Sequence, residues 1–377
     1  MEIPLLDLTA QYESISGELD EAVRAIVLSQ RFILGEPVEQ LETSLAEMIG
    51  VGYTVGCASG TDALLLPLRA FWRKSEDEVV IPAFTFFATA GAVWNAGYRP
   101  VFCDVDPVTF NVTAEMVAAA WTDRARGVIP VHLFGQMAPM AEIRAVARER
   151  GGFVLEDAAH AIGASQYLST GGAGSVGGVK AGATGDAGAF SFFPTKNLGG
   201  FGDGGLVSTN DAELADKLKK LRVHGGLKMY HHEMVGTNSR LDALQAAVLA
   251  AKLPHLESWS NARRRNATLY DELLTDIAEV ITPTVAPGNV HVYNQYTIRA
   301  RRRDELRDYL NDKGIGSAVY YPLALHLQPC FSELGYREGD LPVSEKLCAE
   351  VLSLPVFPEL GEQRVAAVAE AIRRFYT

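Results

Sequence analysis

Ser59, Gly60 and Thr61 stand between an apolar run at residues 53–58 and a helical pattern at 61–72. The first turn of a helix offers free N–H groups and the positive end of the helix dipole, so this place suits a phosphate. A serine or threonine at such a place is also an ordinary helix cap. The chain has no G-x-G-x-x-G or P-loop lysine in the strand–turn–helix context that these motifs require, so a dinucleotide or ATP site is not supported.

Glu156 and Asp157 lie near the end of the apolar run GFVLEDA, residues 152–158. Open parallel sheets collect ligands beyond the carboxyl ends of their strands. A carboxylate at that place can pair with a positively charged ring nitrogen. The ordinary alternative is a cap for the segment that follows.

Lys196 lies in the stretch SFFPTKN, residues 191–197, and the glycine-rich run GGFGDGG follows at 199–205. Burying an ammonium group is costly unless the group is paired or neutralised. A lysine with a lowered pKa is a nucleophile that can form a Schiff base with a carbonyl compound. The alternative is a surface lysine in a loop.

These three groups together describe one cofactor. They provide a phosphate cradle, an aspartate for a pyridinium nitrogen and a lysine for an aldehyde. Pyridoxal phosphate requires that combination. Their joint occurrence in this order is much stronger evidence than any one of them alone.

The chain resembles the sugar aminotransferases of the DegT type, which are fold-type I pyridoxal-phosphate enzymes. The resemblance covers nearly the whole chain, and its most specific stretches are SFFPTKNLG and LEDAAHA. The other stretches that carry it are FILGEPVEQLE, ASGTDAL, IPAFTFFATA, VHLFG, GTNSRLDALQAA and VYYPLALHLQP.

The resemblance implies a set of cofactor contacts. Lys196 would form the Schiff base and carry the proton, Asp157 would bind the pyridine nitrogen, and Phe86 would lie against the ring. The remaining cofactor contacts would be Ser59, Gly60, Thr61, His160, Ser191 and Asn238.

The resemblance also implies a homodimer, because Asn238 would reach the phosphate from the neighbouring subunit. The substrate would be contacted by Arg240, Tyr320, Tyr321 and His326. No metal ligand is implied.

The activity implied by the resemblance is transfer of an amino group from L-glutamate to a nucleotide-linked keto sugar by a ping-pong mechanism. Similarity in the QYTIR and YYPLALHLQP stretches favours a 3-keto acceptor, while the nucleotide stays open among UDP, dTDP and GDP. One alternative is a dehydratase of the same fold, in which histidine replaces the lysine. Another is a regulator that binds the cofactor without turnover.

The elements that must position these residues alternate along the chain. Apolar runs that favour strands separate helical patterns at 61–72 and 138–150, which is typical of a mainly parallel sheet covered on both faces. Through the resemblance we expect an α/β protein with a mainly parallel seven-stranded sheet between helices and a small C-terminal α+β domain. The expected strands are 53–58, 78–83, 100–105, 127–134, 152–158, 189–193 and 205–209.

We expect one large unit at residues 1–258, with N-terminal helices and the cofactor-binding domain, and a second unit at 259–377. The second unit would begin with a linking helix and contain strands at 291–300 and 317–321. A glycine-rich stretch at 168–186 is longer than the corresponding family segment. This stretch would border the sugar–nucleotide cleft. Because glycine loses much entropy on ordering, we expect a mobile surface loop over its glycine-rich run at 171–188.

The 377-residue chain is acidic, with 34 Lys and Arg against 46 Asp and Glu and a formal charge of −12. This balance argues against nucleic acid or an anionic membrane as a partner. Four scattered cysteines fit a reducing compartment, and no apolar stretch is long enough to span a bilayer. The N-terminus has no signal-peptide pattern, so the expected location is the cytoplasm.

Overall fold

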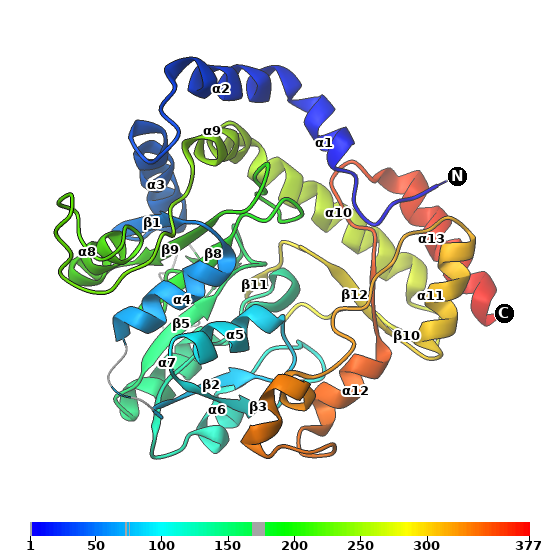
Figure 1. The fold of residues 1–377 in the computed structure, drawn as a ribbon. Coiled ribbons are helices and arrows are strands. Elements are labelled where there is room, and N and C mark those ends of the chain that lie inside the picture. Colours follow the sequence, from blue (N-terminus) through cyan, green and yellow to red (C-terminus); the bar gives the residue numbers. More distant parts are fainter. Residues whose placement is uncertain (1, 72–73, 75, 168–177) are drawn as a thin grey trace, which may run out of the picture.

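The computed structural model describes residues 2–71, 74, 76–167 and 178–377. Its centre is a seven-stranded sheet in the order β1-β9-β8-β5-β4-β2-β3 (Figure 1). Five of these strands, β2, β3, β4, β5 and β8, pair in parallel, and β9 runs antiparallel to both of its neighbours. The strands are β1 (Tyr53–Cys57), β2 (Glu78–Pro82), β3 (Arg99–Cys103), β4 (Ala125–Val128), β5 (Phe153–Asp157), β8 (Ala187–Ser191) and β9 (Gly205–Thr209). The expected mainly parallel α/β sheet is confirmed.

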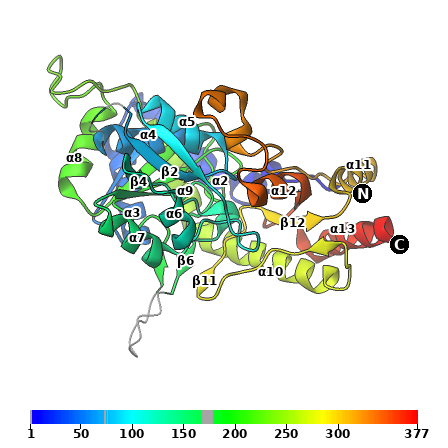
Figure 2. The same ribbon diagram turned by 90° about the horizontal axis from the view of Figure 1, so that it is seen from below.

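Helices cover both faces of this sheet, as Figure 2 shows from below. Because alternate side chains of a strand point to opposite faces, Val79 and Ile81 of β2 join one core and Val80 joins the other. The first core includes α4 (Gly60–Phe71), α5 (Phe87–Asn95) and α8 (Ala212–Leu221). The second core includes α3 (Glu36–Ile49), α6 (Ala114–Ala120), α7 (Met140–Glu149) and α9 (Ala243–Lys252).

The helix α8 shows why such segments become helical. Asp211 caps its N-terminus by accepting from the N–H groups of Glu213 and Leu214 at 2.8 and 3.1 Å. Leu214, Leu218 and Leu221 then return to the same face and are buried against the sheet.

A smaller antiparallel sheet, β10-β12-β13, lies beside the large one. It packs with α10, α11 and α13 around a separate core. The elements of this region are β10 (Val280–Ile281), β12 (Tyr296–Ala300), β13 (Val351–Leu354), α10 (Leu256–Leu274), α11 (Arg303–Asp312), α12 (Pro342–Glu350) and α13 (Gly361–Tyr376). The remaining helices are α1 (Leu8–Ser14), α2 (Ser16–Ser29) and the short 3-10 turns η1 (Leu133–Gly135), η2 (Leu253–His255), η3 (Leu325–Leu327) and η4 (Pro329–Leu334).

The division of the chain after residue 258 stays a prediction. Helix α10 runs through that position. Ile3 packs into the core of the small sheet, and Leu347 of α12 packs into a core of the large sheet. The chain therefore crosses between the two sheets more than once.

Three expected strands differ from the structure. The strand expected at 127–134 ends at Val128, and the 3-10 turn η1 follows at Leu133–Gly135. The segment 317–321 forms only a single bridge, from Ala318 to Ser353, and then leaves the sheet. In the segment 291–300 the strand begins only at Tyr296, because the backbone before it is bonded to the turn at Phe134 and Gly135 instead.

Part of the glycine-rich stretch, residues 168–177, lies outside the described residues. In the described remainder a short strand replaces part of the expected loop, and turns follow it at 181–186. Val179 and Lys180 form β7, which pairs with β6 (Ser165–Gln166), and β6 pairs with β11 (Asn289–Val290). No helix of the described chain is both long and apolar enough to cross a membrane.

Candidate active site

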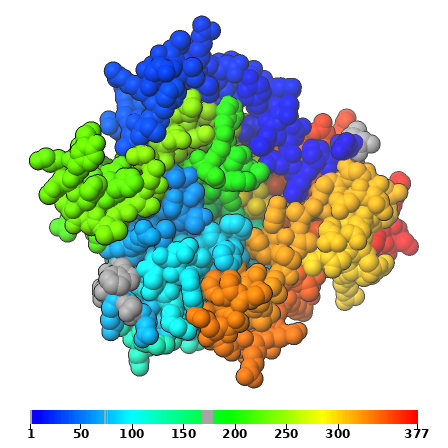
Figure 3. Space-filling model, viewed as in Figure 1, coloured from blue at the N-terminus to red at the C-terminus, as the bar shows by residue number. Residues whose placement is uncertain are grey.

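One cavity of about 530 Å³ opens where the carboxyl ends of β1, β5 and β8 meet the small sheet. The surface there is made by segments far apart in the sequence, coloured blue, cyan, green and orange in Figure 3. Most of the expected site residues line this cavity: Ser59, Gly60, Thr61, Phe86, Asp157, His160, Ser191, Lys196, Tyr320 and Tyr321.

We define the strand-end wall of the cavity as Ser59, Gly60, Thr61, Asp157, Ser191 and Lys196. The hydroxyl of Ser59 accepts from the N–H of Asp62 at 3.1 Å, so Ser59 does cap helix α4. A Cβ on Gly60 would lie 2.6 Å from the Cβ of Ser191. Only a glycine therefore lets the end of β8 approach the first turn of α4, where N–H groups are free to bind an anion.

Asp157 is the last residue of β5, and two neighbouring donors fix the position of its carboxylate. Its Oδ2 accepts from the buried hydroxyl of Thr89 at 2.8 Å, and its Oδ1 accepts from the N–H of Ala159 at 3.2 Å. Burial raises the pKa of Asp157, although these two donors and the charge of Lys196 oppose the shift. A cation brought against this carboxylate would favour its charged form.

Lys196 lines the same cavity, in the turn after β8. Burial lowers the pKa of its ammonium group to about 8, and the carboxylate of Asp157 opposes the shift. A lysine with such a pKa has a substantial neutral, nucleophilic fraction near neutral pH.

We define the small-sheet wall as Gln295, Tyr320 and Tyr321, which come from segments leading to β12 and from the bridge to β13. The ring of Tyr321 lies 6.1 Å from that of Phe86, whose side chain is 57% exposed in the cavity mouth. Burial, and then the charge of Asp157, raises the pKa of Tyr321, so its hydroxyl keeps its proton.

His160 stands between the two walls. Its Nδ1 accepts from the N–H of Phe134 at 3.3 Å, which leaves the ring proton on Nε2. Burial and the charge of Lys196 hold the pKa of His160 well below its ordinary value. The imidazole is therefore neutral and presents an N–H donor.

The structure does not bring Asn238, Arg240 and His326 into this cavity. Asn238 is exposed and forms a bridge with Val223, and Arg240 lines a separate cleft. His326 is only 1% exposed, and its Nε2 lies 3.0 Å from Oε1 of Glu345. The Nε2 of His326 therefore pairs with the half-buried Glu345, and a contact of His326 with the substrate stays a prediction.

Two residues that shape the site, Thr89 and Gln295, were not named as site residues from the sequence. Thr89 supports Asp157, and Gln295 lines the cavity. Glu156, paired with Asp157 in the sequence analysis, faces away from it: its carboxylate accepts from the N–H groups of Gly182, Thr184 and Gly185 at 2.6–2.9 Å. Thr89 and Gln295 lie in the stretches IPAFTFFATA and QYTIR, which carry similarity to the family, but nothing local in the sequence marks either residue as part of the site.

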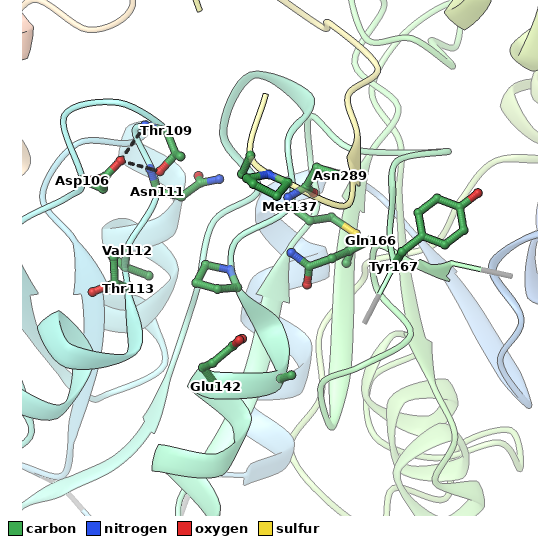
Figure 4. Close-up of a pocket in the computed structure, with 14 residues that line it drawn as sticks. Asp106, Thr109, Asn111, Val112, Thr113, Met137, Glu142, Gln166, Tyr167 and Asn289 are labelled. Carbon is green, nitrogen blue, oxygen red and sulfur yellow. Dashed lines mark hydrogen bonds between the residues drawn. The ribbon is translucent and has the colours of Figure 1, made fainter. Parts of the chain in front are cut away.

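A second cavity of about 460 Å³ lies beside β6 and α7 (Figure 4). None of its described lining residues is a lysine or arginine. Asp106 is already used, because its Oδ1 accepts from the N–H and the hydroxyl of Thr109 at 2.7 and 3.0 Å, and Glu142 points toward the hollow from α7. An acidic cavity without a cation does not suit a phosphate or an aldehyde, so the chemistry belongs to the cavity that holds Lys196.

The model of the DegT/DnrJ/EryC1/StrS aminotransferase family matches residues 13–373. The chain belongs to this family. The aminotransferase is 48% identical over 378 residues to a protein of Geobacillus stearothermophilus named "Pleiotropic regulatory protein", covering 100% of this chain and 99% of the relative. It is 45% identical over 372 residues to UDP-N-acetyl-3-dehydro-alpha-D-glucosamine 3-aminotransferase of Acidithiobacillus ferrooxidans, covering 99% of this chain and 97% of the relative.

Solved structures agree with the family. DesV of S. venezuelae, in complex with a ketimine intermediate, matches with a TM-score of 0.94 and 39% identity over 100% of this chain and 98% of DesV. NtdA of Bacillus subtilis, with bound cofactor PMP, matches with a TM-score of 0.88 and 28% identity over 99% of this chain and 85% of NtdA. The aminotransferase is a pyridoxal-phosphate enzyme, as the three sequence motifs indicate.

The described residues fit this cofactor. The bare backbone at Gly60 and the hydroxyl of Ser191 meet at the N-terminus of α4, a place for a phosphate. Asp157 and Lys196 line the same cavity, so a ring nitrogen and an aldehyde both find partners. Among the described residues, no group of His, Cys, Asp and Glu side chains forms a metal site.

Proposed function

We propose that this aminotransferase transfers an amino group from L-glutamate to a keto sugar carried on a nucleotide, with the keto group at C3. The observation that carries the proposal is the joint lining of one cavity by Lys196, with its pKa lowered to about 8, and the buried carboxylate of Asp157. The relative from Acidithiobacillus ferrooxidans, whose name gives a UDP-linked 3-keto sugar as its substrate, supports the choice of acceptor.

Bound pyridoxal phosphate supplies an aldehyde that reacts with amines and a ring that withdraws electrons. The side chains of the chain do the rest. The neutral amine of Lys196 would take a proton from the carbon that bears the donor nitrogen and deliver it to the aldehyde carbon of the cofactor in the same half-reaction. In the second half-reaction it would carry a proton the opposite way, to the keto carbon of the sugar. Asp157 stays charged opposite the ring nitrogen, and Thr89 holds that carboxylate in place. Ser59, Gly60, Thr61 and Ser191 bind the phosphate, and Phe86 lies against the ring.

The enzyme works as a homodimer in this proposal. The loop between α8 and α9 extends beyond the body of the molecule (Figure 2) and exposes Leu227, Met229, Tyr230 and Val235 by 60–92%. Exposed apolar side chains grouped in this way favour a protein contact. Asn238 follows this loop, is exposed, and lies outside its own cavity, which suits a residue that completes the site of a second copy.

The location proposed for the dimer is the cytoplasm. Cys57, Cys103, Cys330 and Cys348 are all free, which fits a reducing compartment.

The absorbance of the bound cofactor tests the function. Addition of L-glutamate alone should convert the cofactor to its amine form, and a later addition of a nucleotide-linked 3-keto sugar should restore the original band. A panel of UDP-, dTDP- and GDP-linked 3-keto and 4-keto sugars then identifies the acceptor. Restoration by 4-keto sugars alone would contradict the C3 assignment.

The same measurement separates the regulatory alternative, which the name of the Geobacillus stearothermophilus relative brings forward. A regulator without turnover should show a band that glutamate leaves unchanged. A dehydratase would remove a hydroxyl from the sugar without consuming glutamate. The presence of Lys196 argues against a dehydratase, because in such enzymes of this fold histidine replaces the Schiff-base lysine.

The dimer has its own test. Tyr230→Asp, a charge placed in the exposed loop, should produce a monomer with weakened cofactor binding in sedimentation and titration experiments. Ile281→Asp, on the exposed side of β10 with 55% of Ile281 accessible, is the matched control and should remain dimeric. A dimeric Tyr230→Asp variant with normal cofactor binding would exclude this loop from the interface.

A further inference from the structure

The segment from His291 to Gln295 is held firmly although it is not a strand. The N–H of Val292 donates to the carbonyl of Gly135 at 3.0 Å, and the N–H of Gln295 donates to that of Phe134 at 3.4 Å. Asn197, the residue after Lys196, donates from Nδ2 to the carbonyl of Val292 at 2.9 Å. The backbone that carries Gln295 is therefore fixed relative to Lys196.

The carboxamide of Gln295 has no partner in the described part of the protein. Its Oε1 is buried and accepts no hydrogen bond, and the residue lines the cavity that holds Lys196. A buried polar atom without a partner costs about 1–3 kcal/mol. Because the backbone of Gln295 is fixed and its Oε1 has no protein partner at the cavity, we expect a ligand in the cavity to supply that hydrogen bond.

The neighbouring groups restrict what that ligand is. His160 is neutral with its proton on Nε2, and burial raises the pKa values of Tyr320 and Tyr321, so all three present uncharged donors. Lys196 is the only Lys or Arg side chain among the described lining residues. A neutral wall of this kind suits hydroxyl or acetamido groups on a sugar ring and offers no counter-ion to the carboxylates of an amino acid.

We propose that Gln295 hydrogen-bonds a hydroxyl or acetamido group of the acceptor sugar and so helps to select the acceptor over the amino donor. The inference rests on the proposed function, because both half-reactions must use this cavity. A carboxamide both donates and accepts, so it can serve a hydroxyl or a secondary amide.

Separate half-reactions test this role. Gln295→Leu keeps the approximate volume and removes the hydrogen bonds. The rate with L-glutamate should stay within about twofold of wild type, whereas kcat/KM for the keto sugar should fall about 10- to 100-fold, as expected for one lost hydrogen bond. Gln295→Asn keeps the amide on a shorter side chain, and its kcat/KM for the keto sugar should lie between those of wild type and Gln295→Leu. The cofactor spectrum and thermal midpoint of both variants verify that they fold.

Gln166→Leu is the matched control. Gln166 is another glutamine whose Oε1 is buried without a partner, but it lines the second cavity (Figure 4). This variant should react with both substrates as wild type does. If Gln295→Leu does the same, or if it slows both half-reactions equally, Gln295 does not select the acceptor, while the proposed function stands. If wild type itself accepts no keto sugar, the proposed function fails and this inference fails with it.

Discussion

Residues of the strand-end wall stand at or just beyond the ends of β1, β5 and β8, so a local motif and a strand end are enough to place them. The small-sheet wall is held by contacts between distant segments. Asn294 donates to Asn197, for example, across 97 positions of the sequence at 3.1 Å. Residues that follow a strand in the sequence therefore meet at the edge of the large sheet. The residues of the small-sheet wall reach the cavity only through the packing of the two sheets.

The two walls also differ in charge. The strand-end wall carries Lys196 and Asp157, and the small-sheet wall carries only neutral amide and phenol groups. We infer that the first wall is fixed by the cofactor, which is common to the family, and that the second varies with the sugar. Substitutions in the strand-end wall should therefore slow the half-reactions with both substrates. Substitutions in the small-sheet wall should slow only the half-reaction with the keto sugar.

Replacement of Lys196 gives the largest expected effect. Lys196→Ala should reduce both half-reactions by about 10⁴-fold or more, because the proton carrier is lost. Lys196→Arg should be as inactive, since a guanidinium group does not release its proton. Rates of the half-reactions with each substrate, measured separately, check this. Lys180→Ala, a lysine in β7 outside the cavity, should remain active. A Lys196→Ala enzyme that still aminates its acceptor at a comparable rate would falsify the assignment.

The sequence was sufficient for the strand-end wall because each of its signals is local. Asp157 follows an apolar strand and Lys196 follows SFFPT, so the type of residue and its place in an element are visible together. Of the seven expected strands, all appear in the large sheet. The role of Glu156 was not visible, because its donors in the 182–185 turn lie more than 25 positions away.

The small-sheet wall was predicted only in part, and for the same physical reason. Tyr320 and Tyr321 were expected at the substrate through the family resemblance, but as part of a strand that the structure does not form. His326 was expected beside them and is instead buried against Glu345. Gln295 begins the QYTIR stretch that favours a 3-keto acceptor, but it was not named as a site residue, because the sequence does not show that its side chain lines the cavity one position before the strand begins.

Glu156→Gln tests the link between the two walls. The Glu156 carboxylate, which is 0% exposed, holds the 182–185 turn and His132, and His132 precedes the turn that carries Phe134. Loss of its charge should destabilise the fold by about 3 kcal/mol in urea unfolding, because buried donors lose a charged acceptor. Glu142→Gln, at an exposed position in α7, should change stability by about 0.5 kcal/mol or less.

The same residue predicts a pH dependence. Burial alone would raise the pKa of Glu156, but the bond from His132 and the N–H groups of Gly185 and Gly182 outweigh it, and the net pKa is lowered from 4.5. The unfolded chain therefore binds this proton more readily, so the stabilisation is complete above pH 4.5 and is lost as the pH falls through the lowered value. Wild type should lose stability relative to Glu156→Gln in this acidic range. Parallel acid-unfolding curves would contradict the assignment.

The interaction between the two charged groups of the strand-end wall can be measured directly on Lys196. With a pKa of about 8, its neutral fraction should rise about tenfold between about pH 7 and about pH 9. Acylation of the cofactor-free protein, followed at the Lys196 peptide by mass spectrometry, should accelerate by that factor. Because Asp157 raises the pKa of Lys196, Asp157→Asn should move the profile to lower pH. An unchanged profile would show that Lys196 and Asp157 do not interact in the cavity.

Thr89→Val gives the smallest expected effect and asks whether the strand-end wall depends on the layer behind it. The substitution keeps the shape of Thr89 but removes the hydroxyl that donates to Asp157 at 2.8 Å. Without this donor the pKa of Asp157 should rise further, because burial is less opposed. Cofactor affinity, measured by titration of the cofactor-free protein, should fall about tenfold or less. Thr89→Ser should restore it, since the hydroxyl returns. If Thr89→Val binds the cofactor as wild type does, the carboxylate is held by Ala159 and the cofactor alone, and the strand-end wall needs no support from α5.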